Sequence, residues 1–385
     1  MSTTHDLGPL VRLWGIRTQD LPPQTATADE LAPFLTAILG EAIPFIDSAA
    51  PKSNPNNPNN NNNNAAATNK LWKSKGSKSH PDSAARVEVS ERVVPARDLE
   101  EAAAAAKDRK RNKILRPETW CCRRSVHADA ARRGTASWAE FERCFRDEHA
   151  ASESRFTPSV AGAREAVRWG GCEGVVVDLD LDVDVDVRHQ QAGEGEGEDA
   201  TKQKQKQKQK QRWTHFGLAV VEMRHKIGRP LLKDRTFPIL QMTCSITTTT
   251  TTTAAAEEEE QQQQQHQQGE REFLVVSIPV PDFGAPAASP AAVLSREKGA
   301  LVAPYVAVER VRGIPGTENI EWLMATASDA GGALPMWAQT LAAPGVIWKD
   351  VPLFLGWIAG EREKGKGKGK AEQDQGVDAS VGTGA

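Results

Sequence analysis

Cysteine and tyrosine are scarce in this chain of 385 residues, which contains five Cys and a single Tyr. The cysteines form no CxxC pair, so the sequence indicates neither a disulfide framework nor a zinc knuckle. They are Cys121, Cys122, Cys144, Cys172 and Cys244. We therefore expect a reducing compartment, and the sequence predicts no metal and no other cofactor.

An excess of charge of one sign is also missing. The chain has 48 Lys and Arg against 51 Asp and Glu, a formal net charge of -3, so no basic field predicts a nucleic-acid partner. Long apolar runs are missing as well, because the longest, near 351–359, is too short to cross a bilayer. The N-terminus shows no basic segment followed by an apolar one. These absences predict a soluble, cytoplasmic monomer that binds no nucleic acid.

Four stretches of low complexity interrupt the chain, at 54–64, 178–211, 247–271 and 361–385. All of the Trp, Phe and Tyr residues lie outside these stretches. We therefore expect the hydrophobic core to form from the rest of the chain and the repeats to lie on its surface. The predicted organisation has four parts. They are an N-terminal helical segment (1–53), an Asn-rich linker (54–70), a main domain (71–360) with disordered insertions near 98–113, 178–211 and 247–271, and a disordered tail (361–385).

Helical patterns occur at three places. Apolar residues at helical spacing between Leu31 and Leu39 predict a short amphipathic helix ahead of the main domain. Ser137 and Glu140 form a capping-box pattern that opens a second helix. A third, long helix is expected from about Leu334 to Ala359, with breaks or kinks at 344–345 and at Pro352.

Most of the remaining patterned sequence reads as short strands separated by loops. Such a series favours an antiparallel sheet over alternating βαβ units. The predicted strands are 87–94, 119–127, 213–225, 235–246, 272–280, 305–312 and 319–328. A long amphipathic helix that follows such a sheet is suited to cover its concave face.

Several segments carry a resemblance to a known family. The stretches WCCRRSVH (120–127), GTASWAEFERCF (134–145) and VVEMRHKIGRPLLKDRTFPIL (220–240) resemble the fungal START-like family of unknown function, number 3074 in the domain-of-unknown-function series. The segment SDAGGALPMW (328–337) is similar to the end of START lipid-transfer domains. The resemblance implies an α+β helix-grip fold, in which a curved antiparallel sheet wraps around a long C-terminal helix. It also implies an apolar cavity between the two.

Cavity walls are expected from alternate strand positions and from the inner face of the last helix. On the last strand, the face that carries Trp322 is predicted to point inward. Charged residues inside strands have two interpretations. They are either polar groups at the cavity that orient a ligand head group, or members of cross-strand ion pairs on the outer face. The cavity candidates are Arg124, Phe216, Leu218, Glu222, Arg224, Trp322, Met324, Thr326, Trp337, Leu341, Trp348 and Phe354.

Three functions remain open on the sequence alone. The favoured one is non-catalytic binding or transfer of an apolar ligand, a lipid or a sterol, with weak peripheral membrane contact through the lysines of the 361–385 tail. The second is a scaffold with a collapsed cavity. The third is an enzyme acting on an aromatic or polyketide-like substrate, for which Glu222 and His225 are the acid and base candidates.

Overall fold

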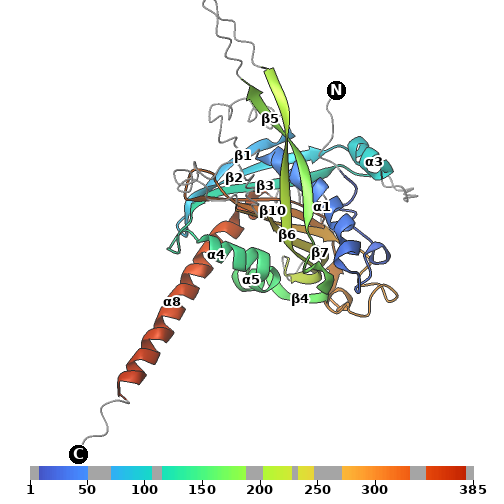
Figure 1. Cartoon of the computed structure of the whole chain (residues 1–385). Helices are drawn as coiled ribbons and strands as arrows, with labels where there is room; N and C mark the ends of the chain where they lie inside the picture. The colour runs from blue at the N-terminus through green and yellow to red at the C-terminus, as the bar shows by residue number, and fades with distance from the viewer. Residues whose placement is uncertain are drawn as a thin grey trace, which may run out of the picture.

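The computed structural model describes residues 8–50, 71–105, 115–187, 203–227, 233–246, 271–329 and 344–378. One curved sheet dominates the molecule (Figure 1). Its strands are β1 (Lys73–His80), β2 (Ser83–Val94), β3 (Glu118–Ala128), β4 (Val160–Arg168), β5 (Val177–Val187), β6 (Gln203–His225), β7 (Asp234–Ile246), β8 (Glu272–Pro279), β9 (Ala300–Val302), β10 (Tyr305–Gly313) and β11 (Asn319–Ser328).

The strand order is β1-β2-β3-β11-β10-β8-β7-β6-β4, with β5 paired to β6 and β9 paired to β7. Every pairing is antiparallel except that of β7 with the short β9. All seven predicted strands are present. The sequence reading missed β1, β4, β5 and β9, because β1 and β4 carry no strong apolar alternation and β5 lies largely within a repeat.

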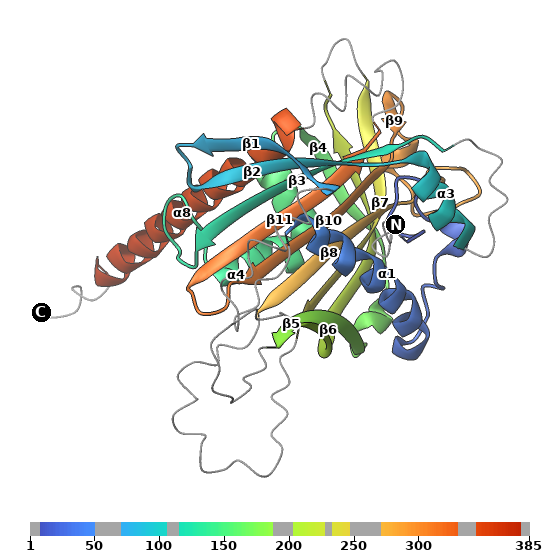
Figure 2. The same ribbon diagram turned by 90° about the horizontal axis from the view of Figure 1, so that it is seen from above.

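Helices cover both faces of the sheet. Figure 2 shows α1 on one face and α4 with α8 on the other. The helical elements are η1 (Thr18–Asp20), α1 (Ala28–Ala49), α3 (Ala96–Ala105), α4 (Trp138–Phe141), the π-helical η3 (Glu142–Asp147), α5 (His149–Phe156), η4 (Gly170–Cys172), η5 (Leu294–Arg296), η6 (Ile347–Lys349) and α8 (Asp350–Asp378). The predicted α+β helix-grip class, with a C-terminal helix against a curved antiparallel sheet, is confirmed.

Helix α1 is part of the main core rather than a separate segment ahead of it. Its buried face includes Leu31, Leu35 and Ile38, which belong to one apolar cluster with the strands. The helix begins with a capping box in which Thr27 and Glu30 satisfy each other's backbone amides. The sequence prediction of a helix here is therefore right, but the division at residue 53 cuts through a shared core.

The length and composition of α1 would also suit a membrane-spanning helix. An 18-residue window within it has a mean hydropathy of 1.3. The sequence prediction considered only unbroken apolar runs and therefore did not include this helix. In the structure, 44% of that window is buried, and the buried residues face the sheet. A buried core helix meets the same criterion, so the feature by itself is weak evidence for a membrane span.

The opposite face of the sheet carries an aromatic cluster. Phe141, Phe145, Trp322 and Phe354 pack there with ring centroids 4.7–6.0 Å apart. The predicted capping box of Ser137 and Glu140 is present and begins α4. Aromatic edge-to-face and offset pairs of this kind add to the stabilisation from apolar burial.

Two predictions about the C-terminal helix are wrong. Pro352 does not interrupt α8, because it lies in the first turn, where the missing amide hydrogen has no intrahelical acceptor to lose. The tail from residue 361 is not disordered as far as Asp378, since α8 continues through it and projects from the sheet (Figure 1). The segment expected to start the helix at Leu334 lies outside the described residues.

Two predicted disordered insertions are also ordered in part. Residues 98–105 belong to α3, which buries Leu99 and Ala102. Within 178–211, β5 and β6 form a long antiparallel ladder in which alternate Asp positions of β5 lie opposite basic positions of β6, as in the Asp178–Arg212 ion pair. Opposite charges at facing positions favour the pairing of two strands. The interpretation of this segment as a solvated repeat did not include that effect. The 247–270 insertion and the 54–70 linker lie outside the described residues.

Candidate functional site

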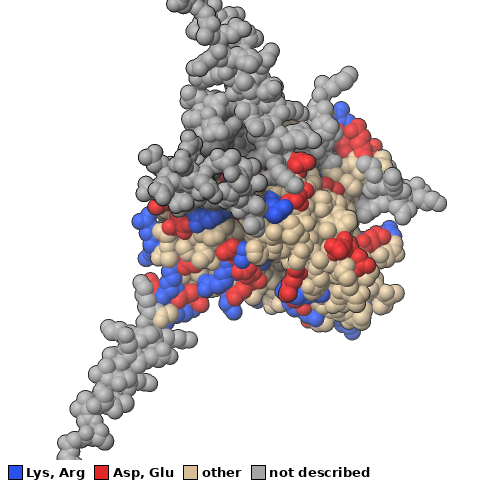
Figure 3. Space-filling model, in the orientation of Figure 1, with Lys and Arg blue, Asp and Glu red and all other residues tan. Residues whose placement is uncertain are grey.

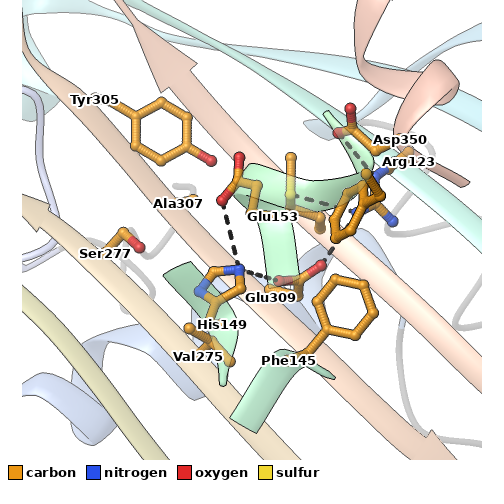
Figure 4. Close-up of a pocket in the computed structure, with 12 residues that line it drawn as sticks. Arg123, Phe145, His149, Glu153, Val275, Ser277, Tyr305, Ala307, Glu309 and Asp350 are labelled. Atoms are coloured by element: carbon orange, nitrogen blue, oxygen red, sulfur yellow. Dashed lines mark hydrogen bonds and ion pairs between the residues drawn. The ribbon is translucent and has the colours of Figure 1, made fainter. Parts of the chain in front are cut away.

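A cavity lies between the sheet and the helices α5 and α8, on the face that carries Trp322 (Figure 4). Its volume is about 40 Å³. Its walls come from six parts of the chain: β3, the η3–α5 segment, β8, β10, β11 and the start of α8. The lining residues are Arg123, Phe145, His149, Glu153, Phe156, Val275, Ser277, Tyr305, Ala307, Glu309, Met324 and Asp350.

The register of four strands builds the floor of the cavity. Val275 of β8 lies opposite Glu309 of β10, Glu309 lies opposite Met324 of β11, and Met324 lies opposite Arg123 of β3. These residues therefore form one row across the sheet and point to the same face. The row places a basic and an acidic side chain on either side of a methionine.

Arg123 and Glu309 form a buried ion pair. Arg123 Nη2 donates to Glu309 Oε1 at 3.1 Å, and the two side chains are 1% and 4% exposed. The same carboxylate oxygen accepts from Trp322 Nε1 at 2.6 Å, while the guanidinium carbon lies 3.9 Å from the Trp322 ring centroid. Asp350 of α8 completes this group, with Oδ2 at 3.6 Å from Arg123 Nε.

His149 of α5 lies between two carboxylates. Its Nε2 is 3.7 Å from Glu309 Oε2 and 3.8 Å from Glu153 Oε2 (Figure 4). Its Nδ1 faces the side-chain amide of Gln241 at 2.5 Å. The distances to the carboxylates exceed those of ordinary hydrogen bonds, so His149 Nε2 contacts both carboxyl groups without a short hydrogen bond to either.

Burial changes the proton affinity of these groups in opposite directions. It raises the pKa of Glu153 to about 8, with further increases from the negative charges of Asp350 and Glu309. It raises the pKa of Asp350 to about 6 against the opposing effect of Arg123. It lowers the pKa of His149, and it raises that of the Tyr305 phenol. At neutral pH the cavity thus contains a neutral imidazole and a largely protonated Glu153.

The side chains around this polar group are apolar. Phe145 and Phe156 belong to the aromatic cluster, and Val275, Ala307 and Met324 come from the sheet. Pockets that enclose a drug-sized ligand typically measure about 300–1,000 Å³, so the cavity in this conformation accepts a head group or water but not an acyl chain. Among the described residues, no group of three or more His, Cys, Asp or Glu is arranged to hold a metal ion.

One of the predicted cavity residues, Met324, lines the cavity. Trp322, Phe354 and Thr326 lie nearby on the predicted face: Trp322 and Phe354 in the aromatic cluster, and Thr326 beside Tyr305. Trp348 packs at the edge of that cluster, near His80 of β1. The inward orientation predicted for the Trp322 face is thus what the structure shows. Trp337 and Leu341 lie outside the described residues.

Two of the apolar residues predicted to line the cavity lie on the opposite face of the sheet. Phe216 and Leu218 belong to the cluster that packs against α1. The residues of β6 on the opposite face, which carries α5, are Ala219, Val221 and Met223. The alternation itself is regular beyond the bulge between Thr214 and Gly217, so the side chains share a face as predicted, but that face is the one opposite the cavity.

The charged candidates are also displaced from the cavity. Arg124 bridges Glu88 and Glu321 on the other face, as the cross-strand ion-pair interpretation anticipated. Glu222 accepts hydrogen bonds from the backbone amides of 293–295 and from Arg164, which makes it an anchor for η5. The remaining candidates are equally structural: Arg224 pairs with Asp234 and Glu297, and His225 packs edge-on against Phe237.

Arg123 and Glu309 are among the charged residues inside the predicted strands, but neither is among the predicted cavity residues. Each belongs to a pair of adjacent charged residues in a strand, Arg123-Arg124 and Glu309-Arg310, so one member must point to each face. The reading chose the wrong arginine. It missed His149 and Glu153 altogether, although their four-residue separation in a helical segment was a signal that both share one helix face.

Comparison with known proteins gives a family and a set of similar folds. The sequence model of a family described as "Protein of unknown function (DUF3074)" matches residues 120–358. No curated protein matches the chain. Human StAR-related lipid transfer protein 5 is similar with a TM-score of 0.39 and 9% identity, over 86% of this chain and 95% of that one.

Two further human structures give comparable values. The crystal structure of human STARD10 has a TM-score of 0.37 and 9% identity, over 83% of this chain and 86% of that one. The lipid transfer and protein localization domain of human StarD13 (DLC2) has a TM-score of 0.34 and 9% identity, over 77% and 94%.

Proposed function

The chain belongs to the DUF3074 family of proteins of unknown function, and we propose that it binds an apolar ligand, a lipid or a sterol, in the cavity between its sheet and α8. The polar group of the ligand would contact the charged residues on the cavity floor, and its apolar body would lie against the aromatic cluster. In this proposal the protein is a binder or carrier, not an enzyme.

The observation that carries the proposal is the charged group enclosed by an apolar layer. Arg123, Glu309 and His149 lie beneath Phe145 and Phe156, at the centre of a face that is otherwise built for apolar packing. Burying charges costs free energy, and a fold that needed only a core would be as stable or more stable with apolar residues there. Polar groups that converge inside an apolar cavity are typical of ligand sites.

Binding requires the cavity to enlarge from its volume of about 40 Å³. The wall most suited to move is the start of α8, because η6 and α8 follow Pro344 and Gly345, where the sequence predicts a break or kink that can serve as a hinge. Asp350, in the first turn of α8, contacts Arg123 on the floor at 3.6 Å, longer than an ordinary hydrogen bond. Displacement of this turn would expose both the charged group and Phe354.

Native mass spectrometry with lipid extraction, applied to the protein purified from a eukaryotic host, tests the proposal. A stoichiometric apolar passenger is the expected result, and its mass names the ligand class. A protein that is empty and takes up no sterol, fatty acid or phospholipid when these are offered would contradict binding and favour the scaffold function with a collapsed cavity.

A second candidate function rests on the opposite pKa shifts in the cavity. A carboxyl group that retains its proton and an imidazole that remains neutral are the acid and base that proton-transfer chemistry requires. His149 and Glu153 replace Glu222 and His225 as the residues for this role. Conversion of an extracted ligand to a product of different mass by wild-type protein, but not by a His149→Gln variant, would support catalysis over simple binding.

A further inference from the structure

The charges around the cavity are unbalanced. Two carboxylates, Glu309 and Asp350, already flank the one guanidinium, Arg123, at 3.1 Å and 3.6 Å. Glu153 is a third carboxyl group, and its near neighbour His149 is neutral at neutral pH. The site therefore contains more acidic groups than its one arginine neutralises.

The two glutamates converge on one place. Glu153 and Glu309 each have an oxygen within 3.8 Å of the same atom, His149 Nε2, so the two carboxyl groups come close to one another at the cavity wall (Figure 4). Of the described residues that line the cavity, Arg123 is the one with a permanent positive charge. The free energy cost of ionising Glu153 would fall if a cation were brought between these oxygens.

The surface around the cavity does not explain the imbalance. Figure 3 shows basic and acidic side chains interspersed over the face that carries α4 and α5. Charges of mixed sign produce little net attraction for a cation or an anion at long range. The selection of ligand charge therefore depends on the groups that face the cavity.

We infer that the apolar ligand carries a protonated amine, which binds between Glu153 and Glu309; this inference rests on the proposed binding function. An ammonium group has three donors and can bond both carboxylates while replacing water around them. A carboxylate head is the alternative, since Arg123 Nε and Nη1 have no hydrogen-bond partner among the residues that the structure describes and are free to donate. An anion on Arg123 would, however, lie beside Glu309 and Asp350, both of which repel it.

Several groups face Glu153 and enter the proton balance of binding. Ionisation of Glu153 by an ammonium group releases a proton, because this carboxyl group is largely protonated before binding and an alkylamine is already charged. The facing groups are His149 on its own helix, Tyr305 and Glu309 on β10, Arg123 on β3 and Asp350 on α8.

Titration calorimetry of the full chain with decylamine, 1-decanol and decanoate below their micelle concentrations tests the inference. We expect decylamine to bind at least tenfold more tightly than decanol, with decanoate the weakest. Decylamine binding at pH 7.5 should also release a proton, seen as a dependence of the heat on the ionisation enthalpy of the buffer. Equal or tighter binding of decanol or decanoate overturns the amine assignment, whereas failure of all three probes to bind overturns the binding function itself.

A pair of variants locates the amine. Glu153→Gln should remove most of the preference for decylamine over decanol and abolish proton release, while decanol binding changes less than twofold. Glu148→Gln makes the same change at an exposed position beside α5 and should leave both properties unchanged. If Glu153→Gln retains the full preference, the amine does not bind at Glu153. The ranking of the three probes on wild-type protein tests the ligand class even if this variant does not fold.

Discussion

Arg123 of β3 and Glu309 of β10 are joined by a 3.1 Å ion pair that crosses over Met324 of the intervening strand β11. Arg123 Nη2 also approaches Met324 Sδ at 3.5 Å, so the methionine lies directly between the two charged side chains. Because both charges are buried, each depends on the other for compensation.

The first prediction concerns this ion pair. Glu309→Gln should lower the free energy of unfolding by about 3 kcal/mol, because it leaves Arg123 buried with its charge uncompensated on that side. Glu88→Gln removes the exposed partner of Arg124 on the neighbouring strand and should cost less than about 1 kcal/mol. Chemical denaturation of the three proteins measures both effects. Similar losses for the two variants would show that the Arg123–Glu309 pair is not strongly coupled.

The second prediction concerns pH. The pKa of Glu153 is about 8 in the folded protein and near 4.5 without the fold, so the folded state binds more protons between these values and stability falls as pH rises through them. The lowered pKa of His149 has its effect below about pH 6.5, and the shift of Asp350 to about 6 has its effect mainly below that value.

The difference in unfolding free energy between wild-type protein and Glu153→Gln at pH 6.5, 7.5 and 8.5 isolates Glu153, because the buried histidines and cysteines with shifted pKa values are common to both proteins. Wild-type protein should lose stability across this range, and Glu153→Gln should lose clearly less. Glu148→Gln is the control and should follow the wild type. If the stability difference between wild-type protein and Glu153→Gln does not change between pH 6.5 and 8.5, the environment described for Glu153 is contradicted.

The third prediction tests the cavity by filling it. Met324→Trp, or the smaller change Met324→Phe, places an aromatic ring in a space of about 40 Å³ and should abolish uptake of an apolar ligand. Both variants should remain folded, with a stability cost of about 1–3 kcal/mol from overpacking. Val293→Phe, at a position that is 48% exposed, is the control. Undiminished uptake by a folded Met324 variant would place the ligand elsewhere.

The fourth prediction concerns the attachment of α8 to the rest of the molecule. Arg362 donates to both oxygens of Glu140 at 2.6 Å and to the carbonyls of Arg132 and Thr135. Arg362→Ala should cost about 1.5–3 kcal/mol, the usual contribution of hydrogen bonds to a charged group, and should loosen the helix. Hydrogen exchange in α8 should accelerate, and ligand uptake should become faster.

Lys364→Ala is the control for α8, because within the described part of the chain the exposed Lys364 pairs with its own helix neighbour Glu361 at 2.8 Å. It should change neither hydrogen exchange nor uptake. If Arg362→Ala also leaves the exchange of α8 unchanged, the helix is not held by this contact, and motion of α8 would not be limited by it.

The strands were predictable because their side chains alternate and their ends carry turn residues. The residues 272–280 and 319–328, for example, were expected as strands and form β8 and β11. The short strand β9 and the polar edge strand β1 were not predictable in this way, because their positions depend on pairing partners rather than on an apolar pattern of their own.

Of the strands that supplied cavity candidates, β11 is the one for which the sequence predicted the correct inward face. The Trp322 face was assigned correctly since Glu321 and Leu323 follow the opposite parity, and the structure places them on the α1 side. On β6 the candidates Phe216 and Leu218 do share one face, but it is the face that packs with α1, so the wrong face was chosen. Parity within a strand says which residues share a face, but not which face the cavity occupies.

The sequence by itself determined the family, the antiparallel α+β architecture and the presence of an amphipathic C-terminal helix, because each depends on local periodicity or on motifs of contiguous residues. The tertiary structure alone decided which charges meet. Arg123, His149, Glu309 and Asp350 come from β3, α5, β10 and α8, and their contacts depend on strand register and helix docking. Those long-range pairings also set the burial that shifts the pKa values of Glu153 and His149, since a carboxyl or imidazole group responds to the atoms around it in space rather than to its neighbours in the chain.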